Sequence, residues 1–112
     1  MPIQSDPNAV DQREVLALIK SLVAIGDYHF SNKVLGYLED GCYGLEDLEA
    51  GIMTARSIRK IEVDELQMAV DGYKYTIIGR DSEGYEFYTC GKIIESKMDH
   101  KMYFFITAHG TD

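Results

Sequence analysis

Basic, phenolic and imidazole side chains in the second half of the chain could assist the cleavage of a phosphodiester bond. Alternate residues of a strand share a face, so one face of a predicted sheet carries Lys74, Arg80, Tyr88, Lys92 and His109. Metal-independent cleavage of RNA needs a base, an acid and cations that stabilise the phosphorane. Arg80, Tyr88, Lys92 and His109 are therefore the candidate catalytic residues, and an ordinary solvated sheet face is the alternative.

The placement of these side chains depends on a hairpin turn at residues 81–84, DSEG. This sequence is typical of a type I turn followed by a glycine in the left-handed region. The turn predicts the cross-strand pairs Asp81 with Tyr85, Arg80 with Glu86, Ile78 with Tyr88 and Ile77 with Thr89. The opposite charges in the second of these pairs support the register. The same register also sets Lys74 opposite Lys92, which counts against it.

Tyrosines on both sides of this turn could form a stacking platform for nucleic acid bases or the core of the sheet. In the register above, one face is almost wholly apolar and carries Tyr73, Tyr75, Ile77, Tyr85, Phe87 and Ile93 with Gly79 and Gly91. The opposite face is mixed. We therefore predict that Tyr73, Tyr75 and Tyr85 pack beneath helices, and that only Tyr88 is placed to touch a ligand.

Three helices are predicted ahead of the sheet. The first starts at a cap formed by Asp6 before Pro7 and ends at Gly26. Its apolar residues recur at the spacing of one helical face, at Val15, Leu18, Ile19, Leu22 and Ile25. Ser31 caps the second helix, which ends near Gly41. Its inward-facing residues are Val34, Leu35 and Leu38. The third helix covers LEDLEAGIM, and its apolar face carries Leu45, Leu48 and Ile52.

From about residue 56 onward, β-branched and aromatic residues alternate with turn-forming residues. Strands are predicted at YKYTIIGR, YEFYTCGKII and MYFFITAH, and residues 56–66 are either a fourth strand or an extension of the third helix. Helices followed by hairpins predict an α+β domain, with N-terminal helices packed on a three- to four-stranded antiparallel sheet. The 112 residues form one predicted domain, with a flexible N-terminus at 1–8, a helical part at 9–53 and a sheet part at 56–109.

The chain is acidic, with a net charge of −8, and neither half is basic. Proteins that bind nucleic acids usually neutralise phosphates with a basic patch, so the charge disfavours RNA as a partner. The charge favours either solubility alone or a basic protein as a partner. Carboxylates of the helical part form either a solvated face or a docking surface for such a protein: Asp27, Glu39, Asp40, Glu46, Asp47 and Glu49.

No apolar run approaches the roughly 20 residues that span a bilayer, and the N-terminus lacks the pattern of an export signal. We expect a cytoplasmic protein without a membrane partner, in which Cys42 and Cys90 are reduced. The histidines and cysteines do not occur at the close spacing of zinc motifs, and there is no glycine-rich phosphate loop. No metal and no cofactor are therefore predicted.

Four segments occur in an order similar to that of a small bacterial family of unknown function, related to the RelE/MqsR-like toxins: FSNKVLGYLEDG, LEDLEAGIMTARSI, YKYTIIGRDSEG and FFITAH. The resemblance covers roughly residues 12–109. It implies a few helices packed on a curved antiparallel sheet. For the toxin relatives it implies mRNA cleavage that a cognate antitoxin neutralises. Ser31 and Arg80 match the family pattern.

The sequence departs from that pattern at positions where the family carries ionisable groups. Lys33 stands where members have a histidine, and Tyr37 and Gly41 stand where arginine is frequent. Together with the acidic charge, these differences favour a non-catalytic relative that acts by binding an antitoxin-like or basic protein. A toxin-like, metal-independent ribonuclease is the alternative. Ser31, Lys33 and Lys74 are the predicted binding residues.

Overall fold

The computed structural model describes residues 11–110, so the predicted cap at Asp6 and the predicted flexible segment 1–8 lie outside the described residues. Helix α1 (Gln12–Ala24) begins at Asp11, whose carboxylate accepts two amide hydrogen bonds of the first turn. The helix ends at Ala24 with Ile25 as its C-cap, and Gly26, with a φ of 83°, follows as the stop. The amides of Gly26 and Asp27 donate hydrogen bonds to carbonyls of the last turn. Gly26 is the stop that the sequence predicts.

Helices α2 (Asn32–Glu39) and α3 (Leu45–Met53) also occur where they are predicted. Ser31 caps α2, because its hydroxyl accepts a hydrogen bond from the amide of Val34. Residues Val34, Leu48 and Ile52 are buried. Leu35 and Leu45 are 39% and 45% exposed, contrary to the prediction, because α2 buries only Val34 and the buried face of α3 is formed by Leu48, Gly51 and Ile52.

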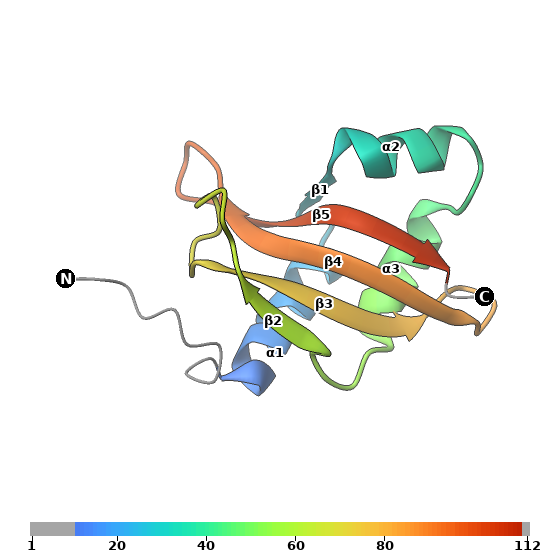
Figure 1. Cartoon of the computed structure of the whole chain (residues 1–112), viewed down its shortest axis with the longest axis horizontal. Coiled ribbons are helices and arrows are strands. Elements are labelled where there is room, and N and C mark those ends of the chain that lie inside the picture. The colour runs from blue at the N-terminus through green and yellow to red at the C-terminus, as the bar shows by residue number, and fades with distance from the viewer. Residues whose placement is uncertain (1–10, 111–112) are drawn as a thin grey trace.

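Five strands form one mixed sheet in the order β1-β5-β4-β3-β2. Their bounds are Tyr28–Phe30 for β1, Lys60–Val63 for β2, Tyr73–Arg80 for β3, Glu86–Glu95 for β4 and Lys101–Gly110 for β5. Helices α1 and α3 lie behind the sheet in Figure 1, and α2 lies beyond the edge that β1 and β5 form. The chain is thus α+β, and residues 56–66 contain a strand instead of a helical extension.

Strand β1 was not predicted, and it pairs in parallel with β5. The predicted sheet is therefore wrong in its number of strands and in this one orientation. Three residues are too few to show a periodic pattern. The strand forms because Tyr28 and Phe30 pack against the core, where the ring of Tyr28 meets that of Phe105 edge to face at 5.5 Å.

The hairpin of β3 and β4 has the predicted register, with Arg80 opposite Glu86 and Ile78 opposite Tyr88. Tyr73 and Tyr75 are buried beneath the helices, as expected. Tyr85 is 60% exposed, contrary to the prediction, because it belongs to the turn and lies ahead of the first residue of β4.

Strand β5 contains a bulge that the strict alternation of its sequence does not predict. Cys90 of β4 pairs with Thr107, but the next residue, Gly91, pairs with Phe105. Ile106 is therefore the extra residue, and its carbonyl accepts a hydrogen bond from the Ser31 hydroxyl at 2.8 Å. After the bulge, each side chain of β5 lies on the face of the sheet opposite to the one that strict alternation predicts.

No helix of the described part of the chain is long and apolar enough to cross a membrane.

The core lies between the sheet and the helices and is built from α1, α3 and the inner faces of β3, β4 and β5. Both cysteines are free, Cys42 exposed and Cys90 buried.

The closest approach of a helix to the sheet depends on Gly79. A Cβ atom at this position would overlap the carbonyl oxygen of Gly51 in α3. We predict that Gly79→Ala lowers the free energy of unfolding by about 3 kcal/mol, because the helix must move away from the sheet. Chemical denaturation measures the loss. The control is Gly36→Ala in α2, where a Cβ meets nothing within 4 Å and should stabilise by about 1 kcal/mol; equal effects of the two substitutions would contradict this packing.

Candidate functional site

Three of the four candidate catalytic residues lie close together at one end of the sheet. Tyr88 pairs with His109, and their rings stack with centroids 4.6 Å apart. Arg80 shares the face of Tyr88, since it pairs with Glu86, two residues earlier on β4. Its guanidinium donates to the carbonyl of Gly84 at 3.0 Å.

Lys92, the fourth candidate catalytic residue, lies apart from Arg80, Tyr88 and His109. It lies six residues beyond Glu86 on β4, which is about 20 Å along a strand. Its side chain is only 2% exposed and forms an ion pair with Asp64, with 3.1 Å between Nζ and the nearer carboxylate oxygen. The expected convergence of cations on an open sheet face is therefore absent, because the chain between β2 and β3 covers this part of the face.

The predicted binding residues are also separate from one another. Ser31 has a structural role as the cap of α2 and as the donor to the bulge in β5. Lys33 is exposed on α2. Lys74 lies opposite Glu62 of β2, at the other edge of the sheet.

Three of the carboxylates for which the sequence left a solvated face or a docking surface open form contacts within the chain. Asp27 binds His100 at 2.8 Å, and Glu49 accepts from the Tyr28 hydroxyl. Asp47 accepts both the amide and the hydroxyl of Ser82. The helical carboxylates are therefore not one free surface.

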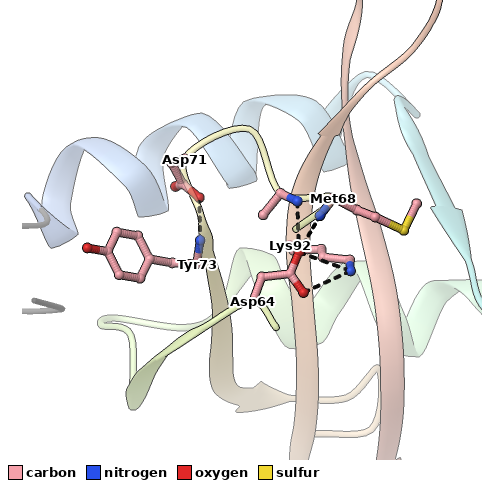
Figure 2. Close-up of polar contacts among 6 residues, drawn as sticks. Asp64, Met68, Asp71, Tyr73 and Lys92 are labelled. Atoms are coloured by element: carbon pink, nitrogen blue, oxygen red, sulfur yellow. Dashed lines mark hydrogen bonds and ion pairs between the residues drawn. The ribbon is translucent and has the colours of Figure 1, made fainter. Parts of the chain in front are cut away.

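The chain between β2 and β3, here called the 64–72 loop, is held down by the buried Asp64. Figure 2 shows its carboxylate between Lys92 and two loop amides, those of Met68 at 2.9 Å and Ala69 at 2.8 Å. Burial alone would raise the pKa of Asp64, but these amide bonds and Lys92 outweigh it, so the pKa lies below the ordinary value. The loop is thus fixed by a charged group.

A second carboxylate fixes the end of the same loop. Asp71 accepts from the amide of Tyr73 at 3.0 Å, as Figure 2 shows, and also from the hydroxyl of Tyr75. Burial, together with the bond to Asp71, raises the pKa of Tyr75. In addition, the amide of Val70 donates to the carbonyl of Ile93 in β4. The loop therefore continues the surface of the sheet.

A groove of about 440 Å³ lies between α1 and the 64–72 loop. We call it the α1–loop groove. Its apolar residues are Val15, Leu18, Val70, Tyr73 and Ile93, and its charged residues are Asp11, Glu14, Asp71 and Lys101. An apolar surface beside three carboxylates and one ammonium group suits a ligand that is both apolar and cationic.

Sequence reasoning did not find this groove. The wall formed by α1 could have been predicted from the sequence. Its residues recur at the spacing of three and four that places them on one side of a helix: Asp11, Glu14, Val15 and Leu18. The wall formed by the 64–72 loop could not have been predicted, since its conformation depends on the hydrogen bonds that Asp64 accepts from the loop. Within residues 11–110, no group of three or more His, Cys, Asp or Glu side chains is arranged to hold a metal ion.

Comparisons of this chain with protein-family models, with curated proteins and with solved structures give no match. The resemblance to the RelE/MqsR-like toxins therefore stays a prediction.

Removing one partner of the buried ion pair should be more harmful than removing both charges. We predict that Asp64→Asn lowers the free energy of unfolding by about 3 kcal/mol, because the Lys92 ammonium stays buried without a counter-charge. The double variant Asp64→Asn with Lys92→Met should lose clearly less. Urea denaturation of both variants checks the order, and a double variant that is less stable than the single one would contradict it.

The same pair predicts how stability depends on pH. A carboxyl whose pKa is lowered by folding stabilises the protein above its unfolded-state pKa of about 4, and this contribution is lost as the pH falls through the folded-state value. The stability of the wild type should therefore fall more steeply than that of Asp64→Asn between about pH 5 and pH 2. Thermal unfolding at a series of pH values measures both slopes; parallel curves would show that Asp64 does not titrate with folding.

Proposed function

We propose that this protein is a binding module that takes a basic, amphipathic segment of a partner protein into the α1–loop groove. The observation that carries the proposal is that five apolar side chains line the same groove as three carboxylates, here called its acidic rim, and one lysine. The net charge of −8 acts in the same direction, since it attracts a basic partner over a longer range.

Two further apolar side chains of the 64–72 loop are exposed, although they do not line the groove. Leu66 is 75% exposed and Met68 is 60% exposed, both on the 64–72 loop next to Val70. Large aliphatic side chains that are exposed together on a well-held loop are typical of protein interaction sites. They would contact the apolar side of the segment while the carboxylates of the rim bind its lysines or arginines.

The fixed position of the loop favours binding without a large rearrangement. Asp64 and Asp71 together accept hydrogen bonds from three backbone amides of residues 68–73, as well as from two side chains. A wall that is ordered before binding loses little conformational entropy when the partner arrives.

This proposal agrees with the non-catalytic interpretation that the sequence favours. The ribonuclease alternative required several free cations on the sheet face, and Lys92 is committed to Asp64. The stacked Tyr88 and His109 lie at the other end of the sheet from the groove.

A synthetic helical peptide with leucines on one face and lysines on the other is the probe for the groove. We predict that it binds the wild type, and that Glu14→Lys weakens binding about fivefold to tenfold, because one rim charge changes from attractive to repulsive. A matched peptide with glutamates in place of the lysines should not bind. Fluorescence anisotropy of labelled peptides measures the affinities.

The control variant is Glu83→Lys, which makes the same change in net charge at an exposed position of the turn between β3 and β4. It should keep most of the affinity. If Glu83→Lys weakens binding as much as Glu14→Lys does, the peptide responds to overall charge alone and the groove is not the binding site.

A further inference from the structure

Four cationic side chains of this acidic chain line two adjoining hollows beside the connection between α3 and β2. The first hollow, of about 460 Å³, is lined by Arg13 and Lys20 of α1 and by Arg56 of the connection. The second, of about 550 Å³, is also lined by Arg56 and is bounded by Arg80 and Glu86 at the ends of β3 and β4. We call this surface the basic strip.

The charge of the basic strip is opposite to that of the chain. The sequence contains nineteen carboxylate residues and eleven lysines and arginines, yet of the residues that the structure describes, Glu86 is the single carboxylate lining the two hollows. Within residues 11–110, the side chains of Arg13, Lys20 and Arg56 form no ion pair. Their charges are therefore available to an anion.

Hydrogen bonds hold one side of the strip in place. The amide of Arg80 donates to the hydroxyl oxygen of Thr54 at 2.7 Å, which fixes the end of β3 against the start of the connection. The guanidinium of Arg80 donates to the carbonyl of Gly84 at 3.0 Å, so its remaining donors stay oriented. Arg56 lines both hollows and is placed to contact a ligand that extends from one into the other.

The lining residues indicate the class of the anion. Guanidinium groups match the geometry of phosphate oxygens and bind them with two hydrogen bonds, and two hollows suit an anion with phosphates in series. In the described part of the chain, no aromatic side chain lines either hollow. Single-stranded nucleic acids bind chiefly where aromatic rings stack on their bases, so a small molecule is favoured over RNA.

We propose that the basic strip binds a small molecule with a chain of two or more linked phosphates, such as inorganic polyphosphate or a nucleoside polyphosphate. The two sources share the phosphate chain that the arginines bind. In a nucleotide, the nucleoside would lie against Leu16 or Ile78, the apolar residues of the two hollows. This site is separate from the α1–loop groove and does not depend on the function proposed for that groove.

Isothermal titration calorimetry at low salt, with inorganic tripolyphosphate as the probe, tests the proposal. We expect the wild type to bind it, and Arg56→Ala to weaken binding about tenfold or more, because charge-assisted hydrogen bonds are lost from both hollows. Lys20→Ala provides a second variant at an independent position. A nucleoside triphosphate, titrated in parallel, distinguishes the sources: equal affinity indicates the phosphate chain alone, and tighter binding indicates contacts to the nucleoside.

The matched control is Arg59→Ala, which removes an equal charge from an exposed residue that lines neither hollow. It should change the affinity by less than about twofold, the effect of a screened surface charge. Three results would overturn the proposal: absence of tripolyphosphate binding, an equal loss in Arg59→Ala and Arg56→Ala, or binding of a short single-stranded RNA in place of tripolyphosphate.

Discussion

The ion pair between Lys92 and Asp64 is the constraint on which the rest of the structure depends. Two charges that are almost fully buried are tolerated only when each is paired and hydrogen-bonded, and here the carboxylate also accepts the amides of Met68 and Ala69. The pair thereby fixes the loop after β2 on the outer face of the sheet. That loop closes off part of the face that the sequence left open, and it supplies one wall of the α1–loop groove.

Strand β1 and the bulge in β5 form a second, linked device at the opposite edge of the sheet. The hydroxyl of Ser31 donates a hydrogen bond to the carbonyl of Ile106, the extra residue of the bulge. The amide of Ser31 donates to the carbonyl of Phe105. One residue therefore ends β1, starts α2 and holds the bulge. After the bulge Ala108 turns into the core in place of Thr107, which leaves His109 on the outer face beside Tyr88.

Local signals in the sequence were sufficient for α2, α3, the end of α1 and the central hairpin, but not for the start of α1, which is capped by Asp11. Ser31, Gly26 and the DSEG turn specify caps, stops and register through contacts a few residues away. The features that could not be predicted depend on residues far apart: β1 is defined by its parallel partner, and the burial of Lys92 by Asp64, 28 residues earlier. A lysine on the mixed face of a strand looks solvated until the segment that covers it is known. The basic strip combines α1, the connection after α3 and the end of β3, and no sequence pattern joins these segments.

Helix α1 separates two surfaces of opposite sign. Asp11 and Glu14 lie at the α1–loop groove, whereas Arg13 and Lys20, on the same helix, lie at the basic strip. The helix therefore carries a transverse electric dipole, distinct from the axial dipole of its backbone. A charged body that approaches within the screening length of about 10 Å at moderate salt exerts a torque on such a dipole. A charged ligand of either surface, as proposed above, would be oriented by this field before contact, and added salt would remove the orientation without altering the fold.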